Sequence, residues 1–174
     1  MSAVDYFLIW WLRRARYRWS KLYRALFDQK YRGTQLPHPN SLEDVEQCLC
    51  QVDWVRDTPS MLFDAISHPE TVWAKKKDDC DGFSILAAAL LNQLLPSSNP
   101  VLVTAMVRPV GKSHTVCAFE TNDGLWFFDN RLLRKEDCQI YADVVAKITH
   151  DVDRVICWDV VKHDTLETLE FHLA

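Results

Sequence analysis

Helical spacing of apolar residues dominates the first part of the chain. An amphipathic helix is expected from about residue 6 to residue 31, because apolar side chains recur there at spacings of three and four. The apolar positions are Leu8, Leu12, Ala15, Trp19, Leu22 and Leu26. The segment 33–40 contains one glycine and two prolines, which predicts a linker and a domain boundary after this helix.

Further helices are expected before the chain reaches Pro96. Ser41 fits the N-cap of the first of them, with Asp44 at the capping-box position. The longest apolar run begins at Cys80 and is stopped by Pro96, so it predicts a buried helix. The predicted helices cover residues 41–54, 60–66, 68–73 and 80–95.

After Pro96, β-branched and alternating patterns replace the helical one. Strands are predicted over 100–108, 113–120, 125–130 and 154–161, a helix over 140–149, and either a strand or a helix over 165–173. Asn122-Asp123-Gly124 predicts a hairpin that pairs residues whose numbers sum to about 244 or 245. The predicted fold class is therefore α+β, with N-terminal helices and a cysteine-bearing helix packed on an antiparallel sheet.

Charge divides the chain of 174 residues into two unequal parts. The net charge is −4, and residues 1–32 hold eight basic side chains against Asp5 and Asp28, so this segment is net +6 and the remainder net −10. We expect a basic helical arm and linker over residues 1–35 and a catalytic domain over residues 36–174. The arm is expected to bind the acidic body, a dimer mate, another acidic partner or an anionic surface, and nucleic acid is the least favoured partner.

The cysteines and the start of the chain suggest a cellular compartment. Six cysteines lack CxxC spacing and lie mostly in apolar runs, which is typical of reduced core thiols. The start lacks the basic region of a signal peptide, and the apolar run from Tyr6 to Leu12 is too short to span a bilayer. A cytoplasmic location is expected.

Cys80 lies at the predicted N-terminus of a helix, a position that can activate a thiol. The first turn of a helix presents unpaired N–H groups, which favour a thiolate and can stabilise an oxyanion. The neighbouring Asp78, Asp79 and Asp81 act in the opposite sense, because carboxylates disfavour a second negative charge. A cation near Cys80 is therefore required, and a histidine is the usual candidate.

The predicted hairpin supplies that histidine and a carboxylate. His114 lies near the start of one strand and Asp129 near the end of its partner, so the expected register places Asp129 diagonally beside His114. Such a carboxylate can orient the imidazole while the other ring nitrogen takes the proton of Cys80. Together the three residues predict a catalytic triad.

The order of these residues resembles the transglutaminase-like superfamily, and is most similar to the bacterial transglutaminase-like cysteine proteinases of papain-like fold. The resemblance covers residues 54–130. It is carried by Trp54, Asp57-Thr58-Pro59, Asp79-Cys80-Asp81-Gly82-Phe83, Ser113-His114-Thr115-Val116 and Leu125-Trp126-Phe127-Phe128-Asp129-Asn130. By this resemblance, Cys80 is the nucleophile, His114 the general base and acid, and Asp129 the orienting carboxylate. The same resemblance implies that the backbone N–H of Trp54 is the second donor to the oxyanion.

The resemblance also concerns calcium. The family motif reads Asp-Cys-Glu-Asp and binds calcium in some members, whereas this chain has Asp81 and Gly82 at its last two positions. A calcium site at Asp79 and Asp81 has lost one ligand, and calcium prefers six or more oxygens. We therefore expect no cofactor.

The function expected from the sequence is acyl transfer on amide bonds through a thioester, by a transglutaminase-like cysteine peptidase or hydrolase. Its expected substrate is a protein or peptide. Release of the acyl group to an amine, as in a transglutaminase, stays open. The alternative is a non-catalytic transglutaminase-like binding module, whose basic helix holds a protein, membrane or nucleic-acid partner.

Overall fold

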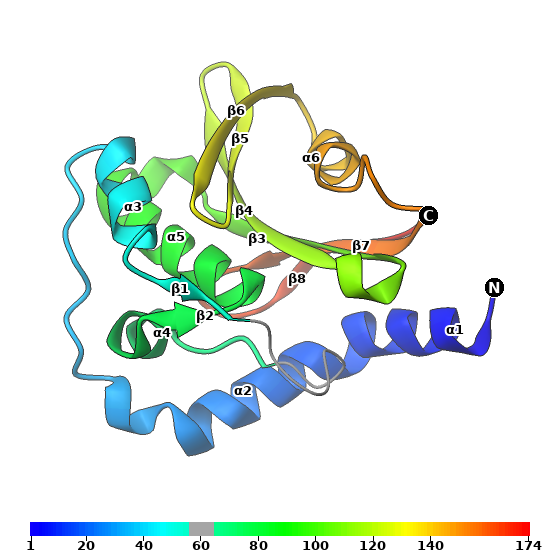
Figure 1. Cartoon of the computed structure of the whole chain (residues 1–174), viewed down its shortest axis with the longest axis horizontal. Coiled ribbons are helices and arrows are strands. Elements are labelled where there is room, and N and C mark those ends of the chain that lie inside the picture. The colour runs from blue at the N-terminus through cyan, green and yellow to red at the C-terminus, as the bar shows by residue number, and fades with distance from the viewer. Residues whose placement is uncertain (56–64) are drawn as a thin grey trace.

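A six-stranded antiparallel sheet forms the centre of the computed structural model, which describes residues 1–55 and 65–174 (Figure 1). Across the sheet the strands are β6 (Leu132–Cys138), β5 (Gly124–Asp129), β4 (His114–Thr121), β3 (Val101–Arg108), β7 (Arg154–Lys162) and β8 (Thr168–Leu173). Strands β4 and β5 pair Cys117 with Phe128, which confirms the register expected from the hairpin. The α+β class is confirmed, and the last segment of the chain is a strand.

Helices and short segments surround this sheet. The helices after the N-terminal region are α3 (Leu42–Leu49), α4 (Pro69–Lys75), α5 (Cys80–Leu94) and α6 (Tyr141–Ile148). Short 3-10 segments cover Gln29–Tyr31, Pro96–Ser98 and Val110–Lys112. Two-residue strands β1 (Asp53–Trp54) and β2 (Lys77–Asp78) pair in parallel. Helix α3 ends earlier than expected. The helix predicted over 60–66 falls largely outside the described residues, and residues 65–68 are not helical.

The two faces of the sheet are covered by different helices (Figure 1). One face packs against α5, behind which lie α3 and α4, and the other packs against α6. Alternation along β3 explains the division, because Leu102 and Met106 belong to the α5 side whereas Val101 and Val103 belong to the α6 side. The site residues at the start of α5 are thus held against the middle of the sheet.

The N-terminal helix consists of α1 (Ala3–Trp10), a π-helical turn (Trp11–Ala15) and α2 (Arg16–Phe27). Up to the turn, the expected apolar face is buried, with Leu8 and Leu12 at most 1% exposed. Beyond the turn the apolar positions face outward, and Trp19, Leu22 and Leu26 are 39%, 49% and 62% exposed. Polar residues are buried instead, namely Arg16, Tyr17, Ser20 and Arg24.

The π-helical turn is the physical reason for this change of face. The N–H of Arg16 donates to the carbonyl of Trp11, five residues back, so the turn holds more residues than an α-helical turn and rotates the helix that follows. The buried polar groups have partners. Ser20 Oγ accepts from the N–H of Ile66, and Arg24 donates to the carbonyls of Ile66 and Ser67.

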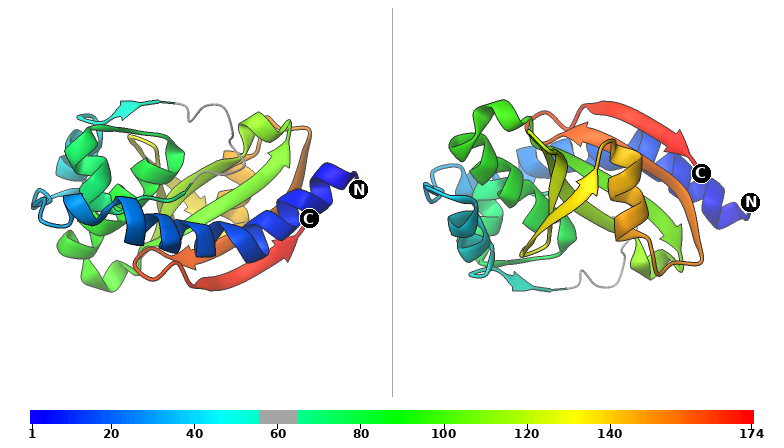
Figure 2. Two further views of the ribbon diagram at one scale, coloured as in Figure 1. Left: turned by 90° about the horizontal axis from the view of Figure 1, so that it is seen from below. Right: turned by 90° about the horizontal axis from the view of Figure 1, so that it is seen from above.

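The N-terminal helix belongs to the same core as the rest of the chain. Leu8, Trp11, Leu12 and Tyr17 join the apolar cluster that contains α5 and one face of the sheet. Figure 2 shows the helix lying across the strands when the molecule is seen from below. The boundary expected near residue 35 therefore does not separate two cores. Within the described residues, no helix has the length and hydropathy needed to cross a membrane.

Candidate active site

Cys80 begins α5, and local contacts fix this helix end on the sheet. The Asp79 side chain accepts a hydrogen bond of 3.0 Å from the N–H of Asp81 and so caps the helix. Ser84 Oγ lies 2.7 Å from the Cys80 carbonyl and 3.0 Å from the Thr115 carbonyl, and can donate to either. This hydroxyl therefore links the first turn of α5 to β4, one residue from His114.

Close packing at this turn also requires a glycine. A Cβ at Gly82 would lie 2.2 Å from the Cβ of Asp78, which is far inside van der Waals contact. The Asp78 carboxylate in turn accepts a hydrogen bond of 2.9 Å from the N–H of Asp79. Gly82 thus allows the chain before Cys80 to fold back against the helix, and this accounts for a glycine where the resembling family has an aspartate.

His114 and Asp129 are joined as the hairpin register predicted. Nε2 of His114 lies 2.8 Å from Oδ1 of Asp129, and both side chains are partly buried. The hydrogen bond with His114 lowers the pKa of Asp129 below its ordinary value, against the effect of burial. Asn130 Nδ2 donates to the same carboxylate over 3.3 Å. An ionised Asp129 therefore fixes the imidazole through Nε2.

One cavity of about 260 Å³ brings the predicted residues together. Cys80, His114 and Trp54 all line it, together with Asn130, and Asp129 is hydrogen-bonded to His114. Cys80 and His114 both belong to the described part of the chain and line the same cavity, but no hydrogen bond joins their side chains. Apolar side chains of the N-terminal helix close one side of the cavity, namely Leu8 and Trp11.

The backbone N–H of Trp54 is not used in the pairing of β1 with β2. In the β1–β2 pair, the N–H of Asp53 donates to Lys76 O over 2.8 Å and that of Val55 to Asp78 O over 3.0 Å. Neighbouring N–H groups along a strand point in opposite directions, so the N–H of Trp54 points away from β2. The Trp54 residue is 52% exposed at the edge of the cavity.

The surroundings of Cys80 keep its thiol protonated. Burial is the main cause that raises the pKa of Cys80 well above its ordinary value, and the charges of Asp81 and Asp79 raise it further. A backbone hydrogen bond from Thr115 and the charge of Arg16 act in the opposite direction. Proton removal by a neighbouring base is therefore needed before this sulfur can act as a nucleophile.

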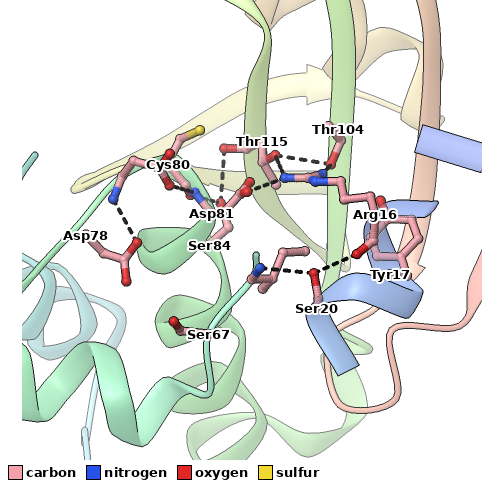
Figure 3. Close-up of polar contacts among 12 residues, drawn as sticks. Arg16, Tyr17, Ser20, Ser67, Asp78, Cys80, Asp81, Ser84, Thr104 and Thr115 are labelled. Atoms are coloured by element: carbon pink, nitrogen blue, oxygen red, sulfur yellow. Dashed lines mark hydrogen bonds and ion pairs between the residues drawn. The ribbon is translucent and has the colours of Figure 1, made fainter. Parts of the chain in front are cut away.

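Arg16 is the residue that the sequence analysis missed. Its guanidinium reaches from α2 to the carboxylate of Asp81 and forms a buried ion pair, with side chains 5% and 4% exposed (Figure 3). It also donates to the hydroxyls of Thr104 and Thr115 over 3.0 and 3.5 Å. The cation required beside the acidic residues is thus partly supplied by Arg16. The acidic neighbourhood of Cys80 was its only signal in the sequence.

A second buried carboxylate, Asp159, lies beside Thr104 and Thr115 on the sheet. Thr104 pairs with Thr115 on β4 and with Asp159 on β7, so the three side chains lie side by side on the α5 face. Tyr17 Oη donates to the Asp159 carboxylate, with oxygen distances of 2.8 and 3.0 Å. Burial raises the pKa of Asp159 to about 7. Two consecutive residues after the π-helical turn, Arg16 and Tyr17, therefore dock on one polar row.

A calcium ion does not fit the acidic residues around Cys80. Among the described residues, the one cluster of potential metal ligands is Asp79, Cys80 and Asp81. Asp79 caps α5, and Asp81 is paired with the guanidinium of Arg16. A cation bound there would face the positive charge of Arg16 with few oxygen ligands, whereas calcium takes six to eight.

No family model matches this sequence, and no curated protein matches it significantly.

Proposed function

We propose that this protein is a cysteine-dependent acyl transferase acting on amide bonds, a peptidase or amidase by default. One observation supports this function most strongly: the His114–Asp129 hydrogen bond of 2.8 Å stands at a cavity that Cys80 also lines, at the N-terminus of α5. Nucleophile, base and orienting group are then supplied by three adjacent elements. The proposal includes a papain-like, transglutaminase-like core and a protein or peptide substrate.

The chemistry follows from the positions of these groups. Nδ1 of His114 takes the thiol proton, and the sulfur of Cys80 bonds to the amide carbon, whose C=O electron pair moves onto oxygen. The N–H groups of Cys80 and Trp54 stabilise this oxyanion. Breakdown breaks the C–N bond, and the amine leaves with the proton from His114. Water, or an amine in the transglutaminase variant, then releases the acyl group from the thioester.

The proposed location is the cytoplasm. All six cysteines lie in described residues and are free thiols, four of them buried, which fits a reducing compartment.

The alternative function is a non-catalytic binding module of the same fold. Its support is the raised pKa of Cys80, because burial and two carboxylates keep the thiol protonated unless His114 removes its proton. The two functions make opposite predictions about the reactivity of this thiol.

Alkylation of the thiols by iodoacetamide at neutral pH distinguishes them. The exposed Cys50 is an internal reference, since it lies on the surface, away from the cavity. We expect Cys80 to react faster than Cys50, and the His114→Ala variant to lose this advantage, because thiolate formation depends on the imidazole. Peptide mapping by mass spectrometry gives both rates in one sample.

Turnover is measured in parallel with fluorescently labelled casein. General-base catalysis contributes about 10²- to 10⁴-fold, so His114→Ala should lower turnover by that factor and Cys80→Ala should abolish it. A wild-type Cys80 that reacts no faster than Cys50 identifies the binding module and overturns the enzyme.

A further inference from the structure

The rotation at the π-helical turn leaves an apolar stripe on the outside of α2. Trp19, Leu22 and Leu26 are 39%, 49% and 62% exposed. Spacings of three and four place Trp19, Leu22 and Leu26 along one face of the helix. Exposed large apolar side chains are common singly, but a continuous stripe of them marks an interaction surface.

A basic stripe runs beside the apolar one. Arg14, Arg18 and Lys21 are exposed and follow one another at spacings of four and three. The two acidic residues of the segment 1–32, Asp5 and Asp28, are both buried, so no carboxylate on this segment offsets the basic side chains at the surface. These two stripes, with Arg14 contributed by the π-helical turn before α2, are called the outer surface of α2, and this surface is both apolar and strongly positive.

We propose that the outer surface of α2 docks on an anionic membrane surface. The occupant must satisfy both stripes at once. A bilayer with anionic lipids does so, because the apolar stripe enters the boundary between headgroups and acyl chains while the basic side chains stay among the headgroups. A nucleic-acid backbone would leave Leu22 and Leu26 in water, and a symmetric contact with a second copy would bring two positive surfaces together.

This function does not depend on the chemistry of Cys80. The helix is already folded and held by buried contacts such as Arg24 with the carbonyls of Ile66 and Ser67. Docking therefore requires no folding on binding, and the outer side chains can be changed without disturbing the core. Membrane attachment through one helix face is peripheral, which agrees with the absence, among the described residues, of a helix able to cross a bilayer.

Vesicle co-sedimentation tests the proposal with the full chain. We expect binding to vesicles that contain phosphatidylglycerol, little binding to phosphatidylcholine alone, and weakening by salt. Each basic residue near an anionic surface contributes about 1 kcal/mol, a factor of about five, so Arg14→Gln/Arg18→Gln/Lys21→Gln should weaken partitioning roughly 100-fold. Leu22→Ser/Leu26→Ser should weaken it as well.

Leu132→Ser/Leu173→Ser is the matched control, because both leucines are exposed elsewhere, at 54% and 61%. This control should bind as the wild type does. The proposal is overturned if the Leu22→Ser/Leu26→Ser variant binds normally, if vesicles do not retain the wild type, or if the stripe instead holds together a dimer that size-exclusion chromatography detects without lipid.

Discussion

At the scale of single residues, the charge beside Cys80 depends on an ion pair whose partners are 65 positions apart in sequence, Arg16 and Asp81. The charged or titratable residues that line the cavity together with Cys80 are Asp79, Asp81, His114, Arg16 and Lys112. Removing Arg16 leaves the Asp81 carboxylate uncompensated, and a buried charge without its partner costs about 3–5 kcal/mol. Both the thiolate and the fold are expected to lose stability.

Substitutions of the two partners should therefore act in opposite directions on Cys80. Arg16→Met should raise the pKa of the thiol and lower its alkylation rate at neutral pH, because the charge of the guanidinium lowers that pKa. Asp81→Asn should lower the pKa and speed alkylation. The double variant should return toward wild type, as measured by alkylation rates across pH.

Arg18→Met is the control for these measurements, because Arg18 lies two residues beyond Arg16 in α2 but is exposed. General damage to the helix would slow alkylation in both single variants. A slower Asp81→Asn protein would therefore contradict an electrostatic role for the pair.

Asp159 makes the stability of the fold depend on pH. Its pKa is about 7 in the folded protein against 3.8 for the ordinary group, so between these values the folded state keeps a proton that the unfolded state has lost. The free energy of unfolding should fall as pH rises from about 4 to about 7, by up to about 4 kcal/mol at 1.36 kcal/mol per pKa unit, and then level off.

Urea unfolding at a series of pH values measures this contribution. Asp159→Asn keeps an oxygen that accepts from Tyr17 but has no proton to lose, so the fall between pH 4 and 7 should be reduced. Asp123→Asn, at an exposed position, should keep the wild-type profile. Equal pH profiles for Asp159→Asn and wild type would mean that Asp159 does not titrate in this range.

At the scale of elements, the sequence predicted those whose pattern is local. Helix α5 follows from an apolar run between a cap and Pro96, and the β4–β5 register follows from Asn122-Asp123-Gly124. Strand β6 was not predicted, because its sequence is rich in charged residues, as suits the edge of a sheet. A strand that is defined mainly by its pairing with a neighbouring strand cannot be recognised from the alternation of apolar and polar residues in its own sequence.

The face of α2 shows a different reason for failure. Its apolar periodicity predicted a helix but not the side that faces the sheet, because the π-helical turn rotates the helix so that Arg16 and Tyr17 face the sheet. Buried partners stabilise this arrangement, and those partners, Asp81 and Asp159, lie far along the chain. Cys80, His114 and Asp129 could be predicted from local motifs and a hairpin, whereas Arg16 required tertiary contacts.

At the scale of the whole molecule, the N-terminal helix is part of the core. Deletion of residues 1–32 removes Leu8, Leu12 and Tyr17 from the main apolar cluster and leaves Asp81 and Asp159 buried without their partners. We expect the shortened chain to lose its cooperative unfolding transition in urea, as measured by circular dichroism.

The variant Arg14→Gln/Arg18→Gln/Lys21→Gln, which changes only exposed charges of the same segment, should unfold as the wild type does. Cooperative unfolding of the shortened chain at the wild-type urea concentration would show that the first 32 residues are a separable arm.

The contact between Arg16 and Asp81 also has a consequence during protein synthesis. The arginine leaves the ribosome early, Cys80 later, and His114 and Asp129 later still. A nascent chain that ends before the β4–β5 hairpin therefore carries Cys80 without the base and its carboxylate, and without a finished sheet on which α5 and the N-terminal helix can meet. The proposed site of Cys80, His114 and Asp129 therefore cannot form before the β4–β5 hairpin has been synthesised.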